Sequence, residues 1–227
     1  MTVMKKKLNK TTKSNLITYA MVVIVYIIVQ LLVSGGAVSS LMKGLLVPLC
    51  VYSILAVSLN LTVGILGELS LGHAGFMCVG AYSSALFSHI ASDIPQVPRF
   101  ILAILIGAAV AAVFGVIIGI PVLRLRGDYL AIVTLAFGEI IRNVLNCVYV
   151  SNDAGQLYFG FNNPSLPGKL IVNGPQGAQG LTRISTFTMG FCLIMFTLIV
   201  VLNLINSRSG RAMMALRDNR IAAESVG

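Results

Sequence analysis

Charged residues are scarce in this sequence, and their scarcity excludes an ordinary soluble domain. Only 10% of the 227 residues are Asp, Glu, Lys or Arg, whereas 57% are apolar, and the mean hydropathy is +0.92. One hydrophobic core cannot bury that much apolar surface in a chain of this length. We therefore expect an all-α, polytopic membrane protein with a single transmembrane domain over residues 1–227.

Acidic residues are scarcer still, at 7 against 16 basic ones, which gives a net charge of +9. In a soluble chain this excess would suggest a nucleic-acid partner. Here the basic residues cluster at the ends of apolar segments, where they indicate membrane topology instead. We expect no binding to nucleic acid.

Motifs for metal binding and for ATP hydrolysis are also missing. The four cysteines lack C-x-x-C spacing, so we expect buried thiols and neither a zinc site nor a disulfide framework. No G-x-x-x-x-G-K-[ST] pattern occurs, so the chain cannot supply its own ATPase. We expect no catalytic residue, no metal, no cofactor and no enzyme activity. The cysteines are Cys50, Cys78, Cys147 and Cys192.

What the sequence does contain is a series of long apolar segments, one of them interrupted by glycines. A basic start, an apolar run and then Ala37-Val38-Ser39 would also fit a cleaved signal peptide. The run is about 18 residues long, above the usual length for such a peptide, so we favour an uncleaved first helix. We expect six crossings, at Leu16–Val33, Leu45–Val63, Gly64–Ile90, Phe100–Leu123, Tyr129–Val150 and Ile184–Ile205.

The distribution of basic residues predicts the orientation of these crossings. With the N-terminus inside, the segments on the cytoplasmic side hold eleven Lys and Arg, and those on the outer side hold four. Because cytoplasmic segments carry the excess of positive charge, both ends of the chain are expected in the cytoplasm. The polar segment Ser151–Arg183 is then expected outside, as a loop.

The segment Gly64–Ser84 is apolar enough to enter a membrane but too rich in glycine for an ordinary membrane helix. Interior glycines weaken a helix, and unwound backbone survives in hydrocarbon only where protein or a water-filled cavity satisfies its amides. We expect a broken or re-entrant segment beside a translocation path, with a helix resuming near Ala74. Glycines that only permit close helix packing are the alternative. The substrate pathway is assigned to Gly67, Glu68, Ser70, Gly72 and His73.

Small residues recur at every fourth position in the fourth apolar segment. They are Gly107, Ala111, Gly115 and Gly119. Such a stripe lets another helix approach closely, so we assign it to helix packing.

Polar residues in the fifth apolar segment share one helix face. Glu139, Arg142, Asn143 and Asn146 are spaced i, i+3, i+4 and i+7. Glu139 would lie roughly 15 Å from Tyr129, near the middle of the membrane, where a charge costs about 2.5–3.5 kcal/mol. We therefore expect Glu139 and Arg142 to pair and to face the interior of the helix bundle. Either a structural ion pair or a contact with substrate would explain them.

The glycine-rich segment also carries a family resemblance. Its GELSLGHAGFMCVGAYSSAL resembles the G-x-L-S-L-G-H-A-x-F-x-G-x-G-A-Y of permeases from bacterial ABC importers for branched-chain amino acids, of the LivM type. Cys78 stands where the family usually has Gly. The matching residues are Leu69, Ser70, Leu71, Gly72, His73, Ala74, Phe76, Gly80, Ala81 and Tyr82.

Three further segments resemble the same family in the same order. They are Arg124–Arg142, Asn173–Gly177 and the basic tail from Ser207. At Asn173–Gly177 we expect either a folded surface loop or a docking surface for a solute-binding protein. The tail is similar to the cytoplasmic coupling segment that fits a groove in the ATPase subunit, although a membrane-surface helix is the alternative. The coupling segment spans 207–227, and its assigned residues are Gly210, Arg211, Arg217, Asp218, Ala222, Ala223 and Glu224.

The resemblance implies a permease subunit in the bacterial inner membrane that takes up leucine, isoleucine or valine. Its implied partners are two ATPase subunits, a second permease subunit, an extracytoplasmic solute-binding protein and membrane lipid. Family members continue beyond this tail, so we expect the chain to be a fragment or a truncated product equal to two thirds of the family fold. The alternatives are a urea or short-amide permease, a secondary carrier that uses Glu139 and His73 for ion coupling, and a remnant without transport activity.

Overall fold

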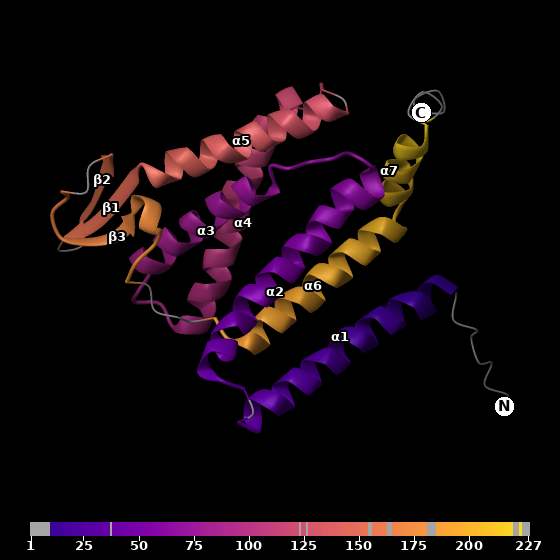
Figure 1. The fold of residues 1–227 in the computed structure, drawn as a ribbon, viewed down its shortest axis with the longest axis horizontal. Helices are drawn as coiled ribbons and strands as arrows, with labels where there is room; N and C mark the ends of the chain where they lie inside the picture. Colours follow the sequence, from indigo (N-terminus) through magenta and orange to yellow (C-terminus); the bar gives the residue numbers. More distant parts are fainter. Residues whose placement is uncertain are drawn as a thin grey trace. The chain divides into compact units, whose positions relative to one another are not determined.

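The computed structural model describes residues 10–36, 38–122, 124–125, 127–153, 156–162, 165–180, 185–219 and 223. Helices dominate this part of the chain (Figure 1). The chain forms two compact units, the first made of Met1–Gly67 and Ser185–Gly227 and the second of Glu68–Ile184. The single transmembrane domain that the sequence suggests stays a prediction.

Unit 1 is a set of long apolar helices that ends in a short polar one. Ser39 and Thr186 cap two of the helices, because their side chains accept hydrogen bonds from the backbone N–H groups of Met42 and Met189. Three of the helices run side by side in Figure 1. The elements are α1 (Lys10–Ser34), α2 (Ser40–Asn60), the π-helical turn η1 (Leu61–Leu66), α6 (Phe187–Asn206) and α7 (Arg208–Asp218).

Contacts from α6 hold the other two long helices of unit 1. A Cβ at Gly190 would lie 2.8 Å from the Cβ of Cys50, so glycine lets α2 approach α6 closely. On the other side, the ring of Tyr26 stacks on Phe191 with centroids 4.0 Å apart. Cys50 is buried by this packing, whereas Cys78 and Cys147 are half-buried and Cys192 is exposed. The prediction of four buried thiols is therefore right only for Cys50, since the other three side chains lie at least partly at the surface of the described residues.

Unit 2 is built around α3, which packs against both of its neighbouring helices and against a small sheet. Its elements are α3 (His73–Ile90), α4 (Gln96–Val122), α5 (Asp128–Asn146), β1 (Val148–Asp153), β2 (Gln156–Phe161), β3 (Lys169–Asn173) and the 3-10 turn η2 (Gly174–Gln176). Phe76 of α3 and Phe137 of α5 pack on one buried cluster that includes Ile118 and Leu130. These contacts fix the start of α3, which directly follows the glycine-rich break.

The segment that the sequence suggests is a polar loop folds as an antiparallel sheet with strand order β2-β1-β3. Residue Val148 pairs with Phe161 and Tyr149 pairs with Asn173. Val150, Ile171 and Val172 are almost completely buried and pack on α3. The fifth helix accordingly ends at Asn146 and not at Val150. The β-branched residues around Val150 form a strand because β2 and β3 pair with them on either side, and those strands come later in the sequence.

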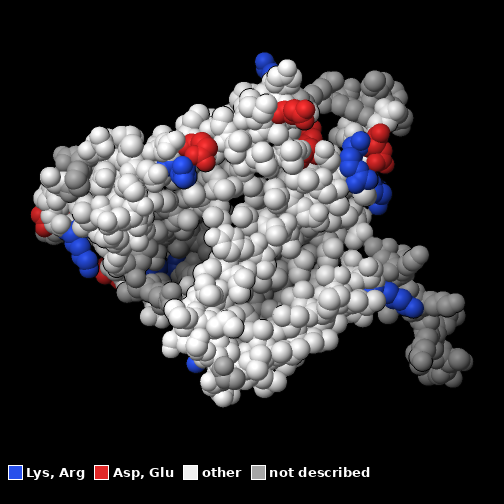
Figure 2. All heavy atoms as spheres, viewed as in Figure 1, with Lys and Arg blue, Asp and Glu red and all other residues white. Residues whose placement is uncertain are grey.

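Four described helical segments are long and apolar enough to cross a membrane: Lys13–Ser34, Ser40–Leu66, Gln96–Val122 and Phe187–Asn206. Figure 2 shows little charge over the long helices of unit 1, whereas basic and acidic residues gather at its short helix α7. The predicted crossings through α3 and α5 do not meet the same standard. The prediction of six crossings therefore stays a prediction, and its boundary residues Leu123 and Ile184 lie outside the described residues.

The small-residue stripe of α4 is used for packing over only part of its length. A Cβ at Gly107 would lie 2.7 Å from the backbone oxygen of Gly80 in α3. Ala111 lies close to Gly80 as well, whereas added methyl groups at Gly115 and Gly119 would meet no described atom within 4 Å. The close contact with α3 thus involves Gly107 and Ala111 and does not extend along the stripe.

This difference predicts opposite effects for two glycine substitutions in one helix. Gly107→Ala should lower stability by about 1–3 kcal/mol, because the new methyl group forces two backbones apart. Gly115→Ala should be neutral or stabilising, since Ala favours the helix by roughly 1 kcal/mol. Thermal unfolding of the two purified variants in detergent measures the difference. Equal losses would show that the Gly107 contact with α3 is not tight.

Candidate functional site

The helical run through α2 and η1 ends at Gly67, as the glycine-rich sequence predicts. Gly67 has φ of 77° and ψ of 13°, in the left-handed region, and its N–H donates to the carbonyl of Thr62. Residues 67–72 then have no regular secondary structure, and α3 begins at His73, one residue before the predicted Ala74. The boundary between the two units falls within this break, directly after Gly67.

On the unit 2 side, the break is held by Thr134 of α5. The Leu71 N–H donates to Thr134 Oγ1 over 3.1 Å, and that hydroxyl donates onward to the Ala131 carbonyl over 3.0 Å. A Cβ at Gly72 would lie 2.6 Å from the Thr134 backbone oxygen. Glycine at this position therefore lets the irregular backbone lie directly on α5, where a hydroxyl replaces a missing helical hydrogen bond.

The five residues assigned to the pathway differ in how they are exposed. Gly72 is buried against α5, Gly67 is exposed, and Glu68, Ser70 and His73 are half-buried. The structure thus brings Gly72 into the packing of unit 2 and leaves the three polar side chains at its partly accessible surface. Their role in a substrate pathway stays a prediction.

The polar face of α5 forms its expected ion pair but in an unexpected place. Arg142 Nε donates to Glu139 Oε2 over 3.1 Å, and the two side chains are 64% and 53% exposed. Asn143 is also exposed, and Asn146 is half-buried. The sequence places this face in the interior of the bundle. In unit 2 that interior is occupied instead by a different face of α5, which packs on α3 where Gly138 lies against Gly75.

The tail folds as α7, which follows α6 with a single residue between them. Ser207 accepts a hydrogen bond from the Gly210 N–H, and a Cβ at Gly210 would clash with the carbonyls of Leu204 and Ile205. Serine and glycine therefore set the turn between the two helices. Beyond α7, Ala223 is half-buried, whereas Ala222 and Glu224 lie outside the described residues.

Two arginines of the tail make different contacts. Arg211 Nη1 donates to the Asn206 carbonyl over 3.2 Å, next to the turn. Arg217 pairs with Asp218 and also reaches the carbonyl of Gly64 in η1 over 2.9 Å. Nothing in the sequence pattern points to this last contact, because the two residues are 153 positions apart.

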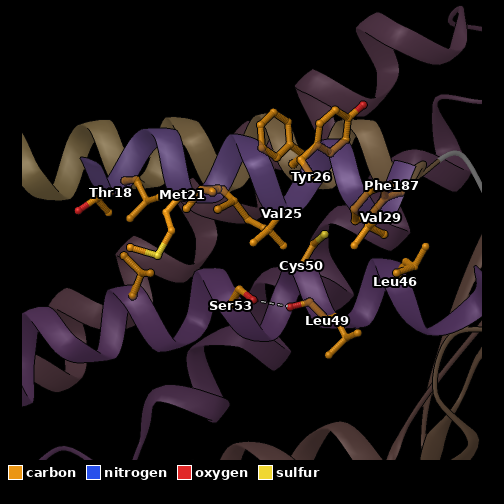
Figure 3. Close-up of a pocket in the computed structure, with 15 residues that line it drawn as sticks. Thr18, Met21, Val25, Tyr26, Val29, Leu46, Leu49, Cys50, Ser53 and Phe187 are labelled. Carbon is orange, nitrogen blue, oxygen red and sulfur yellow. Dashed lines mark hydrogen bonds between the residues drawn. The ribbon is translucent and has the colours of Figure 1, made fainter. Parts of the chain in front are cut away.

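Unit 1 also contains an apolar cavity of about 410 Å³ between α1, α2 and α6 (Figure 3). The hydroxyl groups in its lining are already engaged: Thr18 donates to the Ser14 carbonyl, Ser53 donates to the Leu49 carbonyl, and Tyr26 bonds Thr188. These hydroxyl oxygens can still accept a hydrogen bond, but the lining contains no charged side chain to pair with the carboxylate or ammonium of a zwitterionic ligand. The cavity therefore suits hydrocarbon, such as a lipid chain, better than an amino acid.

Most of the chain matches a known protein family. Residues 41–227 match the family described as "Branched-chain amino acid transport system / permease component". The chain belongs to this family. No solved structure matches the chain.

The relatives of this chain within the permease family include proteins from bacteria and from an archaeon. The "High-affinity branched-chain amino acid transport system permease protein LivM" of Escherichia coli K12 is 32% identical over 211 residues, which cover 78% of this chain and 44% of that protein. The protein of the same name from Salmonella typhimurium gives the same values. The "Probable branched-chain amino acid transport permease protein LivM" of Methanocaldococcus jannaschii is 27% identical over 204 residues, covering 78% of this chain and 56% of its own length. The chain thus spans about half the length of the curated relatives that it matches.

Thr134 lies within RLRGDYLAIVTLAFGEIIR, the segment that resembles the permease family. The sequence alone does not show that its hydroxyl accepts a hydrogen bond from the Leu71 N–H in the break. Replacing it with valine keeps the shape of the side chain and leaves the Leu71 N–H without its acceptor. Thr134→Val should therefore cost about 1–3 kcal/mol. Thr134→Ser, which keeps the hydroxyl, is the matched control. Thermal unfolding and amide exchange at Leu71 measure the effect, and equal behaviour of the two variants would contradict it.

Proposed function

We propose that this chain is the membrane-spanning permease subunit of an ABC importer that takes up branched-chain, hydrophobic amino acids. One observation carries the proposal beyond family membership: a short polar helix, α7, follows the apolar helix α6 with one residue between them. Such a rigid connection suits a helix that receives movement from a separate ATPase subunit. The names of the curated relatives support branched-chain amino acids as the substrate.

The proposed partners follow from the chemistry of the chain. ATP hydrolysis comes from separate ATPase subunits, which contact α7 and the residues after it. A second permease subunit completes the translocation path and covers apolar and charged surface that unit 2 leaves exposed, including Glu139 and Arg142 on α5. An extracytoplasmic solute-binding protein delivers the amino acid, and the small sheet β1–β3 with the turn at Gly174–Gln176 offers it a folded docking surface.

In this proposal the break at Gly67–His73 lies beside the path of the substrate. The Gly67 and Leu71 N–H groups of the break already bond Thr62 and Thr134, so the backbone groups between them are the ones proposed to meet the charged amino and carboxyl groups of an amino acid. Glu68, Ser70 and His73 supply the partly accessible polar side chains of the same segment. Contact with apolar helices beside the break would then favour substrates with hydrophobic side chains.

The rival function, an ion-coupled secondary carrier, fits the geometry less well. A coupling carboxylate must be free to bind and release an ion, whereas Glu139 already accepts a hydrogen bond from Arg142. A urea or short-amide permease shares the fold, and only its substrate differs. Uptake measurements separate these alternatives, because a secondary carrier needs no ATP.

The proposed orientation has the N-terminus and α7 in the cytoplasm and the sheet outside, in the bacterial inner membrane. Gln156 in β2 and Ser209 in α7 are both exposed and suit labelling. In a background without native cysteines, Gln156→Cys should react with an impermeant thiol reagent on cells whose outer membrane is permeabilised, and Ser209→Cys should react only after the inner membrane is opened. Reaction of both from the same side would refute the orientation.

The function itself is tested in proteoliposomes that hold the complete importer with its ATPase and binding protein. Uptake of radiolabelled leucine, isoleucine or valine should require ATP, and urea should not be transported. Ala223→Arg places a large charge where a small residue is half-buried, so it should abolish substrate-stimulated ATP hydrolysis while the solute affinity of the binding protein stays unchanged. Uptake without ATP would overturn the proposal in favour of a secondary carrier.

A further inference from the structure

The side chain of Arg217 points from α7 back to the end of the helical run in unit 1. Its Nη1 donates to the Gly64 carbonyl over 2.9 Å, although the two residues are 153 positions apart. The carbon stem of the same side chain covers Gly67, since a Cβ added there would lie 2.5 Å from Arg217 Cγ. Both contacts lie within unit 1, and α7 packs on η1 around them.

The Gly64 carbonyl needs a donor because the helix stops just after it. The last four carbonyls of a helix have no partner within the helix, and a cation near this end is favoured by the helix dipole. At η1 the Gly67 N–H turns back to the Thr62 carbonyl. Arg217 supplies a charged donor to Gly64 that the broken helix cannot provide for itself.

Gly67 fits this arrangement for two independent reasons. Its φ of 77° lies in the left-handed region that side chains rarely adopt. Its missing side chain also leaves the space that the stem of Arg217 fills. The break is therefore shaped around this one arginine as well as around the turn of the backbone.

Arginine is the side chain that can make all of these contacts together. While Nη1 bonds Gly64, Nε and Nη2 donate to Asp218 Oδ1 over 3.3 and 3.2 Å. The carboxylate thus orients the planar guanidinium toward the carbonyl. A lysine ammonium is a compact charge and cannot span the carbonyl and the carboxylate in this way.

We propose that Arg217 is a positioning residue that fastens α7 to the helix break at Gly64–Gly67, so that a displacement of α7 moves the break directly. This rests on the proposed function, because the ATPase is the source of the displacement. It also changes the role that the family resemblance gives to Arg217: its side chain is directed to the chain's own helix end and not to the ATPase surface. Asp218 supports the same contact by holding the guanidinium.

Amide hydrogen exchange of the permease in lipid nanodiscs tests the fastening without any transport. In Arg217→Ala, exchange across Leu61–Gly67 should rise about tenfold, as expected for the loss of one charge-assisted hydrogen bond. Arg217→Lys should behave nearly like Arg217→Ala. Arg208→Ala, which removes an exposed charge from the start of the same helix, should leave exchange in this segment unchanged.

Two outcomes of that measurement would overturn the proposal. If Arg217→Lys exchanges like the wild type, positive charge alone is sufficient, as for a residue that only contacts anionic lipid. If Arg217→Ala leaves the exchange of Leu61–Gly67 unchanged, Arg217 does not hold the break.

Uptake by the complete importer then tests the transmission. Arg217→Ala and Arg217→Lys should reduce ATP-driven uptake about tenfold, if the bond lost in the exchange measurement is the bond that carries the movement, whereas Arg208→Ala should retain it. Normal uptake in Arg217→Ala despite faster exchange would overturn the transmission role. Failure of the wild-type importer to transport amino acids would refute the proposed function instead, and the exchange result for the fastening would stand.

Discussion

Unpaired backbone groups at a helix break are the constraint on which the rest of this structure depends. In hydrocarbon, each N–H and C=O that leaves a helix must find another partner, because no water replaces it. The break after Gly67 receives such partners from elements far away in the sequence. In unit 2, Thr134 accepts from the Leu71 N–H, and in unit 1, Arg217 donates to the Gly64 carbonyl. Each unit therefore stabilises its own end of the break.

Glycine makes this solution possible by allowing close approach as much as by allowing unusual backbone angles. Gly72 lies on the backbone of α5, Gly107 lies on the backbone at Gly80, and Gly190 lies on Cys50. Membrane helices gain little from the hydrophobic effect when they associate, so close packing contributes a larger share of their stability. A glycine without a neighbour, such as Gly115, contributes nothing of this kind.

The sequence was sufficient for features that depend on local composition and spacing. Apolar length indicated six crossings, of which four coincide with described helices long and apolar enough to span a membrane. Glycine spacing indicated the break, and the i, i+3 spacing indicated the pair of Glu139 and Arg142. Features that depend on distant partners escaped it. The sheet around Val150 needs strands that are separate in the sequence, and the exposed side of α5 is decided by where α3 packs. No motif could predict the partner of Arg217, because its acceptor is the backbone carbonyl of Gly64 in a distant helix end and not a nearby side chain.

Arg142 and Arg217 differ in how their bonds respond to the movement of a helix. A bond between distant elements can transmit such a movement, whereas a bond within one helix cannot. Arg142 is paired within one turn of its own helix, so its bond travels with α5 and is unchanged by any displacement of that helix. Arg217 joins α7 to η1, two elements that are far apart in the sequence and that also pack on each other, so a displacement of α7 relative to η1 would strain or break its bond. The Arg217 side chain is half-exposed on α7, so its proposed role depends on its bond to the Gly64 carbonyl and not on burial. The acceptor of this bond, the Gly64 carbonyl, lies near the end of the helical run through α2 and η1, so under the proposed role of Arg217 a movement of α7 would reach the membrane helices at this end.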